Sequence, residues 1–317
     1  MGYFIAIDGG TTNTRLFLVR GKQVLGTVKK NVGAGKNIGG TGALAEAVRG
    51  GMSELALSAG ISVSDIEKTV ASGMITSGIG LYEVEHIPAP AGVGELRAAV
   101  CRTMLPEISP APFFFVPGVK MCSDDLESAD MMRGEETELV GLMQFSELGS
   151  FSDSLVVLPG SHSKLVKTDG AGRICRFSTM LTGEMIAALA EGTILRDSVC
   201  LSQGEANEES LLLGYRICRE MGINRALFKV RTYKNLLHAT EREVYGFFLG
   251  AVLCGEIDAI LREDAKRIII SGNKYIKNAM TVMLSALSDR EIVCVPDEIT
   301  EKSTVSGLIA LCGADFA

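Results

Sequence analysis

Apolar and polar residues alternate in short blocks at the start of the chain, and this pattern predicts three short strands. Apolar runs at 3–7 and 15–20 flank the small polar stretch DGGTTNT at 8–14, and a GK turn then leads to a third run at 23–31. Short apolar runs joined by tight turns of glycine and small polar residues are typical of β-hairpins. We therefore expect the chain to open with two successive hairpins.

The same order of elements returns half a chain later. Strands are predicted at 154–158, 164–168 and 173–181, and the short turns PGSHS and DGAG join them. A helical periodicity follows each block of strands, at 42–60 in the first half and at 182–195 in the second. Matched strands, turns and helices in one order predict two similar halves.

Further along each half, short apolar runs alternate with helical stretches. We expect strands at 67–74, 112–118, 267–272 and 291–296, and helices at 241–263, 274–287 and 303–314. Strands that alternate with helices favour parallel pairing, with helices covering the sheet faces. The prediction is an α/β protein of two similar domains, each a mixed sheet that opens with β-hairpins. We place the domains at 1–150 and 151–317, with a hinge near 145–153 and the last helix returning to the first domain.

Charge and cysteine content narrow the class of partner. The 317 residues carry a net charge of -7 without a basic stretch, which argues against nucleic acid or a membrane surface. The start of the chain has no signal-peptide pattern, and no apolar run approaches the roughly 18 residues of a membrane span. The eight cysteines are scattered without a CxxC pair, which favours reduced thiols in a cytoplasmic protein over metal or Fe–S ligation. Partners are therefore expected to be small molecules; a homo-oligomer is compatible with the composition.

The first turn has the residues of a phosphate loop. Asp8 ends the first strand, where open α/β sheets place ligand groups, and its carboxylate could hold Mg²⁺. Backbone N–H groups of a glycine-rich turn can approach phosphate oxygens closely, and small hydroxyl and amide side chains can donate hydrogen bonds to them. The candidates for these contacts are Gly9, Gly10, Thr11, Thr12 and Asn13. The alternative is a capped hairpin without a ligand. The nearby GAGKN at 33–37 lacks the spacing and the Ser or Thr of a Walker A motif, so we read it as a loop.

The repeated pattern of strand, DGGTTNTR and strand resembles the sugar kinase, actin and heat-shock ATPase superfamily. Further segments resemble the 2-dehydro-3-deoxygalactonokinase family more closely, in family order along nearly the whole chain: DGGTTNTR (8–15), SGMITSGIG (72–80), IPAPAG (87–92), DMMRGEET (130–137), LPGSHSK (158–164), MLTGEM (180–185) and SGN (271–273). The resemblance implies two ribonuclease H-like, actin-like ATPase domains. It also implies ATP- and Mg²⁺-dependent phosphorylation of a 2-keto-3-deoxy sugar acid, above all 2-dehydro-3-deoxy-D-galactonate to its 6-phosphate.

By the same resemblance, the second half contributes nucleotide-binding residues. The second phosphate loop would comprise Gly160, Ser161, His162, Ser163 and Lys164, and the adenosine-side turn would comprise Ser271, Gly272 and Asn273. Lys164 could balance phosphate charge, with a surface lysine as the alternative, and the SGN turn could be an ordinary strand-to-helix turn.

The segment 130–137 supplies the candidate catalytic acids, because kinases of this type use a carboxylate to accept the hydroxyl proton. Asp130, Glu135 and Glu136 are expected at the start of a helix, with Glu135 preferred as the base. Arg133 could hold the carboxylate of the sugar acid or polarise a phosphate, and Glu136 is also a candidate for substrate binding. Acids favoured simply by a helix start are the alternative.

The segment 72–81 is expected to touch the sugar acid through Met74 and Ser77, and here the chain departs from the family. Family members usually carry polar residues and an aromatic at the positions of Gly78, Ile79 and Leu81. A site without those donors discriminates substrates differently. The alternatives are a kinase for another sugar or polyol, a non-transferring ATPase that acts on a partner protein, and a sugar-acid-binding relative without turnover.

Overall fold

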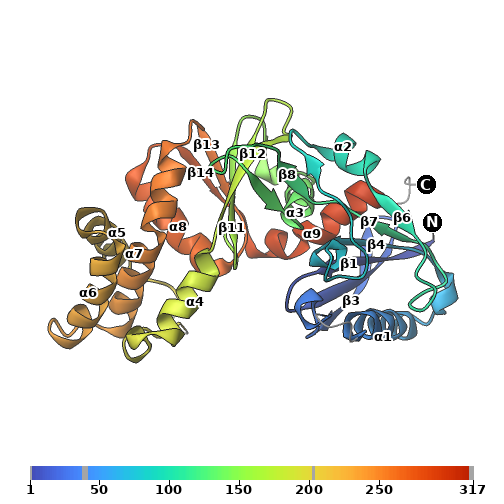
Figure 1. Cartoon of the computed structure of the whole chain (residues 1–317), viewed down its shortest axis with the longest axis horizontal. Helices are drawn as coiled ribbons and strands as arrows, with labels where there is room; N and C mark the ends of the chain where they lie inside the picture. The colour runs from blue at the N-terminus through green and yellow to red at the C-terminus, as the bar shows by residue number, and fades with distance from the viewer. Residues whose placement is uncertain (1, 38–41, 202–203, 314–317) are drawn as a thin grey trace. The chain divides into compact units, whose positions relative to one another are not determined.

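The computed structural model describes residues 2–37, 42–201 and 204–313, so the end of the expected helix 303–314 lies outside the described residues. The chain divides into two compact units (Figure 1). The first comprises Met1–Phe151, Gly172–Arg176 and Glu298–Ala317, and the second comprises Ser152–Ala171 and Phe177–Asp297. The units therefore differ from contiguous halves at 1–150 and 151–317, because two later segments belong to the first unit.

The first unit is built on a six-stranded sheet in the order β3-β2-β1-β4-β7-β6. Its strands are β1 (Tyr3–Gly9), β2 (Thr14–Arg20), β3 (Gln23–Lys30), β4 (Ile66–Gly73), β6 (Cys101–Thr103) and β7 (Phe113–Phe115). β1 pairs antiparallel with β2 and parallel with β4, and β4 pairs parallel with β7. Helix α1 (Ala43–Ser58) buries Leu44, Val48, Met52 and Leu55 against Ile5, Ile7, Leu16 and Leu18 of the sheet. Hydrophobic burial of this helix face holds the hairpins in place.

A five-stranded sheet in the order β12-β11-β10-β13-β14 repeats this topology and lies in the second unit, except for the first residues of β12. The strands are β10 (Leu155–Leu158), β11 (Ser163–Thr168), β12 (Ile174–Met180), β13 (Arg267–Ile270) and β14 (Glu291–Cys294). β10 pairs antiparallel with β11 and parallel with β13, as β1 does with β2 and β4. The predicted fold class, two similar mixed sheets that each open with hairpins, is confirmed.

The second unit also contains the helices α4 (Thr182–Gly192), α5 (Glu208–Met221), α6 (Ile223–Asn235), α7 (Glu241–Arg262) and α8 (Lys274–Leu287). In Figure 1, α5, α6 and α7 gather into one cluster. α7 is long and apolar enough to cross a membrane by length and composition, so the expectation that no run approaches that length is wrong for this helix. However, 72% of its most apolar window is buried inside the unit, which is the property of a core helix.

A small three-stranded sheet, absent from the sequence prediction, lies in the first unit. Its order is β5-β8-β9, from β5 (Ile87–Pro88), β8 (Val119–Met121) and β9 (Asp130–Met132). The short helix α2 (Val93–Ala98) follows β5, and α3 (Glu135–Leu142) follows β9. The last helix, α9 (Asp297–Cys312), crosses α3 closely: a Cβ at Gly141 or Gly307 would collide with the backbone of the other helix. This contact joins the end of the chain to the first unit (Figure 1).

Candidate functional site

Three segments of the first unit meet at the carboxyl ends of β1 and β4. Gly9 pairs with Gly73 across these strands, and a Cβ at Gly73 would lie 2.7 Å from the carbonyl oxygen of Gly9. A Cβ at Gly134 would in turn lie 3.2 Å from Cα of Gly73. Gly73 and Gly134 have φ angles of 86° and 113°, which favour glycine. The segments that converge at this edge of the sheet, where open α/β sheets bind ligands, are 8–15, 72–80 and 130–137.

Asp8 is held in position by Arg15. The two residues face each other in the register of β1 and β2. Arg15 donates from Nε to Oδ2 of Asp8 at 3.0 Å and from Nη2 to the same oxygen. The Asp8 side chain is 22% exposed, and both bonds from Arg15 end on Oδ2. Among the described residues no group of three His, Cys, Asp or Glu side chains could enclose a metal ion. Mg²⁺ typically binds one or two carboxylates together with phosphate oxygens and water, so a single Asp8 fits that ion.

The first loop rests on the GAGKN segment. Gly10 N–H donates to the carbonyl of Asn13 at 2.9 Å and closes the turn. Ala34 N–H donates to the carbonyl of Gly10 at 3.0 Å, and Gly35 N–H to that of Thr11 at 2.9 Å. Thr11 and Thr12 are exposed, and Asn13 is half-buried. Ala34–Asn37 form a short 3-10 helix, where an irregular loop was predicted, and the backbone of this segment supports the first loop, a role that the sequence did not indicate.

The three candidate acids occupy different environments. Asp130 lies in β9 rather than at a helix start, and its Oδ1 accepts from Met131 N–H at 2.7 Å, so its expected position is corrected. Glu135 begins α3, is half-buried, and accepts from Arg133 N–H at 3.1 Å. Glu136 is fully buried. Of the three, Glu135 combines a place at the converging edge with partial exposure.

The Glu136 carboxylate closes the start of α3 from inside the unit. Gly134 N–H donates to both carboxylate oxygens, at 2.9 and 2.8 Å, and the Thr137 hydroxyl donates at 3.2 Å. Burial and the charge of Glu135 raise the pKa of Glu136 to about 8, against the lowering effect of these hydrogen bonds. Because its carboxylate is enclosed in this way, we assign Glu136 a structural role in place of the expected contact with substrate.

Arg133 clamps the segment 74–86 onto the small sheet. Its Nη1 donates to the carbonyl and the hydroxyl of Thr76, at 2.7 and 2.6 Å. Its Nη2 donates to the carbonyl of Val84 at 2.8 Å and lies 3.1 Å from Nδ1 of His86. Burial and the charges of Arg133 and Lys120 lower the pKa of His86 to about 4, so the ring is neutral and Nδ1 accepts. Both terminal nitrogens of Arg133 are thus engaged within the protein, which the sequence did not indicate.

The residues that depart from the family pattern have a packing role. Ile79 and Leu81 pack against the core of the first unit, as does Met74. Gly78 is exposed, and the Ser77 hydroxyl donates to the carbonyl of Met74 at 2.6 Å. Apolar residues at 79 and 81 therefore serve the core. In this loop the backbone and the half-buried Ser77 remain as polar groups near the converging edge.

The second unit brings its own three segments together at the carboxyl ends of β10 and β13. Ser271 N–H donates to the carbonyl of Val157 at 3.0 Å, and Asn273 N–H to that of Pro159 at 2.7 Å. Gly272 has a φ of 126°, and a Cβ there would collide with Pro159. Gly183 N–H donates to the carbonyl of Gly160 at 3.0 Å. The segments 158–164, 180–185 and 271–273 are therefore neighbours.

The side chains of the second loop differ in exposure. Ser161 and His162 are exposed, and Nε2 of His162 lies 2.9 Å from Oε1 of Glu184. Ser163 and Lys164 belong to β11 and are buried, with Lys164 only 4% exposed. Asn273 caps α8: its Oδ1 accepts from the N–H groups of Tyr275 and Ile276, at 3.1 and 3.3 Å. Ser161 and His162 are thus the exposed residues of this loop.

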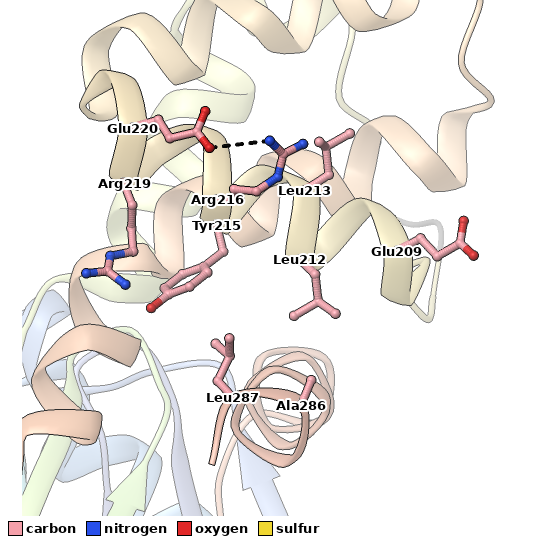
Figure 2. Close-up of a pocket in the computed structure, with 9 residues that line it drawn as sticks. All are labelled: Glu209, Leu212, Leu213, Tyr215, Arg216, Arg219, Glu220, Ala286 and Leu287. Atoms are coloured by element: carbon pink, nitrogen blue, oxygen red, sulfur yellow. Dashed lines mark hydrogen bonds and ion pairs between the residues drawn. The ribbon is translucent and has the colours of Figure 1, made fainter.

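Two cavities lie in the second unit. One of about 280 Å³ follows directly on the 271–273 turn and is lined by Glu205, Ala206, Leu211, Tyr275, Asn278, Ala279, Thr281, Val282 and Cys294. The other, of about 880 Å³, lies between α5 and the end of α8. Figure 2 shows Leu212 pointing across it toward Ala286 and Leu287, with the Arg216–Glu220 ion pair beside it. No residue of the converging segments lines this larger cavity, so we assign it no part in the site.

Comparison with known proteins agrees with this arrangement. The chain matches the sequence model of a family described as 2-keto-3-deoxy-galactonokinase over residues 8–311. A 2-dehydro-3-deoxygalactonokinase of Escherichia coli (strain K12) is 28% identical over 271 residues, which cover 82% of this chain and 80% of that protein.

Solved structures show the same fold. A protein from Sinorhizobium meliloti, assigned as a 2-dehydro-3-deoxygalactonokinase, has a TM-score of 0.76 at 23% identity and covers 98% of this chain and 99% of its own. The activator of the 2-hydroxyisocaproyl-CoA dehydratase from Clostridium difficile, solved with ADPNP, has a TM-score of 0.50 at 16% identity and covers 98% of this chain and 94% of its own. At these identities the likeness concerns the fold alone.

Proposed function

The chain belongs to the 2-keto-3-deoxy-galactonokinase family, a family of kinases, and we propose that it transfers the terminal phosphoryl group of ATP to the 6-hydroxyl of 2-dehydro-3-deoxy-D-galactonate. The substrate is proposed from the name of the family and of its relatives. The observation that carries the chemistry is the convergence of 8–15, 72–80 and 130–137, which brings Asp8, the first loop and the start of α3 to one sheet edge.

We propose that the first loop binds phosphate oxygens and that Asp8 binds Mg²⁺. Asp8 keeps Oδ1 clear of the Arg15 bonds, and the exposed Thr11 and Thr12 can donate hydrogen bonds to phosphate. When bound, Mg²⁺ would neutralise charge on the phosphates during transfer. Arg15 keeps the Asp8 carboxylate in one orientation, and the GAGKN segment at 33–37 keeps the backbone of Gly10 and Thr11 in place.

Glu135 is the proposed general base. As the substrate oxygen attacks the terminal phosphorus, the hydroxyl proton passes to a carboxylate oxygen of Glu135, and ADP leaves with the electrons of the broken P–O bond. Arg133 N–H supports the Glu135 carboxylate at 3.1 Å, and Glu136 fixes the first turn of α3 beneath it. Asp130 is a weaker candidate, because it lies on β9 and its carboxylate is engaged by Met131 N–H.

The sugar acid is proposed to contact the 72–81 loop, with Arg133 acting as a positioning residue. Both terminal nitrogens of the guanidinium are hydrogen-bonded, to Thr76, Val84 and His86. Arg133 therefore holds the 72–81 loop in place, and Ser77 and the loop backbone are proposed to contact the substrate. This replaces the expectation that Arg133 itself holds the substrate carboxylate.

The second unit is proposed to bind the rest of the nucleotide. The exposed Ser161 and His162 can donate hydrogen bonds to phosphate. The 280 Å³ cavity after the 271–273 turn suits the adenine base, because it combines apolar walls with Tyr275, Asn278 and Thr281. Lys164, which is buried in β11, is assigned to the strand rather than to direct phosphate contact.

We also propose a cytoplasmic location and small-molecule partners only. None of the eight cysteines forms a disulfide, and the net charge of -7 disfavours nucleic acid as a partner.

An ADP-release assay with an acceptor panel tests the proposed function. The panel holds 2-dehydro-3-deoxy-D-galactonate, its gluconate epimer, and neutral sugars and polyols, each with ATP and Mg²⁺. Release with the galactonate acid, well above the release without acceptor, is the expected result. Release only with a neutral sugar would contradict the substrate, and release without any acceptor would indicate an ATPase.

A further inference from the structure

The segment MLTGEM at 180–185 has no role in the site described so far, yet it lies directly against the second phosphate loop. Gly183 N–H donates to the carbonyls of Gly160 and Ser161, both at 3.0 Å, and Glu184 N–H donates to that of Ser161 at 3.2 Å. The loop backbone at 160–161 is therefore held by the first turn of α4. Any displacement of this turn would move the loop with it.

One buried carboxylate fixes that turn. Glu256 lies in the middle of α7 and is only 6% exposed. Its Oε2 accepts from the Thr182 hydroxyl at 2.6 Å, and Thr182 is itself buried and begins α4. A hydrogen bond to an ionised carboxylate in such surroundings is stronger than one between neutral groups. α7 thus reaches the start of α4 through a single short contact.

Ser163 of the phosphate loop also influences this carboxylate. Ser163, at the start of β11, is fully buried. Hydrogen bonding by the hydroxyls of Thr182 and Ser163 lowers the pKa of Glu256, against the larger rise caused by burial. Yet neither Ser163 Oγ nor Glu256 Oε1 reaches full hydrogen-bond geometry with any described group.

A buried carboxylate is costly unless it is fully hydrogen-bonded, so its place beneath this loop calls for a reason. A Gln or an apolar residue would fill the same space in α7 at lower desolvation cost. What the carboxylate adds is a charged acceptor for the Thr182 hydroxyl, which keeps that hydroxyl oriented.

We infer that Glu256 is a positioning residue for nucleotide binding: through Thr182 and the first turn of α4 it holds the 159–163 loop in the conformation that receives phosphate. This rests on the proposed function only in that the loop binds nucleotide. Glu256 touches no substrate itself. It acts from behind the loop, so its loss changes nucleotide affinity and leaves the sugar-acid site in the first unit unaltered.

The test measures ADP binding with Mg²⁺ by titration calorimetry, together with the KM values for ATP and for the sugar acid. Removing the hydroxyl or the charge, in Thr182→Val or Glu256→Gln, should weaken ADP binding about tenfold, the size expected for a lost hydrogen bond to a charged group. The KM for ATP should rise in parallel, while the KM for the sugar acid stays within about twofold. The double variant should be no weaker than the single ones, because both remove one interaction.

Two control variants separate positioning from general loss of stability. Thr182→Ser keeps the hydroxyl and should bind ADP like the wild type. Asp258→Asn changes a second acid of α7, whose Oδ1 accepts from the Tyr215 hydroxyl at 2.6 Å. This variant should leave ADP affinity unchanged even if it lowers the melting temperature.

Folded Thr182→Val protein that binds ADP as tightly as the wild type overturns the inference, and so does an equal rise in both KM values. Wild-type protein that binds no ADP overturns the nucleotide assignment itself, and with it the proposed function. The two failures are therefore distinguishable in one set of titrations.

Discussion

Both hydrogen bonds that Arg15 donates to Asp8 end on the same carboxylate oxygen, Oδ2. The pair faces across the first hairpin at the end of β1, and the Arg15 side chain is 39% exposed. This geometry orients the carboxylate and leaves Oδ1 outside the ion pair. An ion pair whose only purpose was to brace the hairpin would gain from engaging both oxygens.

Asp8→Asn is therefore expected to abolish most of the activity. An amide keeps the shape but loses the charge that holds Mg²⁺, so kcat should fall about 100-fold or more. Arg15→Lys keeps a cation near Oδ2 and should cost less than about tenfold. Steady-state kinetics at several Mg²⁺ concentrations measures both. A near-normal kcat in the Asp8→Asn variant would mean that this residue stabilises the hairpin and does not hold Mg²⁺.

Glu135→Gln tests the proposed base. Because the amide cannot accept the hydroxyl proton, kcat should fall by a factor of about 100 to 10,000, with little change in the KM for either substrate. Glu138→Gln is the matched control, since Glu138 also lies in the first turn of α3 and is half-buried. Its kcat should stay within about threefold of the wild type. Equal losses in both variants would point to helix electrostatics instead of proton transfer.

The buried Glu136 predicts a pH dependence of stability. Its folded-state pKa is raised from 4.5 to about 8, so the folded protein holds a proton that the unfolded chain has released between these values. Stability must then fall as pH rises toward 8 and level off above it. The pKa of His86 is lowered to about 4, so this residue makes stability rise with pH. That rise ends near pH 6.5, the ordinary pKa of histidine, so it does not affect the range above.

Glu136→Gln removes the proton equilibrium and should flatten the decline. Denaturant unfolding at several pH values from 6.5 to 9 measures the free energy of unfolding of the variant and the wild type. The difference between them should move in favour of the variant as pH rises to about 8. A constant difference over this range would mean that Glu136 is ionised throughout.

Arg133→Lys should loosen the 74–86 segment. A lysine cannot donate to Thr76, Val84 and His86 at once, so the free energy of unfolding should drop by about 2–4 kcal/mol. The KM for the sugar acid should rise about tenfold, since a site that loses its preformed geometry binds less well, while the KM for ATP should change little. Arg102→Lys, at an exposed position of β6, is the control. A rise in both KM values would assign Arg133 a wider role.

Local sequence signals predicted the hairpins and the repeat because turn chemistry and apolar runs are local properties. The repeat also extends further than we recognised: Ser72 and Gly73 end β4 as Ser271 and Gly272 follow β13. Both serines are buried, and both glycines have positive φ beside the preceding loop. The dipeptide SG at matching places was the signal that could have paired the two segments.

Other features depend on tertiary packing. The small sheet has strands of two or three residues, too short to carry a periodicity, so Asp130 was expected at a helix start and lies in β9. Glu256 in an apolar helix has the pattern of an exposed position; only the packing of α4 beside it encloses the carboxylate. The engagement of Arg133 by Thr76, Val84 and His86 likewise follows from the pairing of β5, β8 and β9.

The most direct test of the central claim is the identity of the phosphorylated product. Wild-type protein is incubated with ATP, Mg²⁺ and 2-dehydro-3-deoxy-D-galactonate, and the reaction is followed by phosphorus NMR. The account predicts a new phosphomonoester signal split into a triplet by the two C6 protons, growing in step with ADP. Inorganic phosphate in place of the ester, or a phosphomonoester split by a single proton, would contradict it.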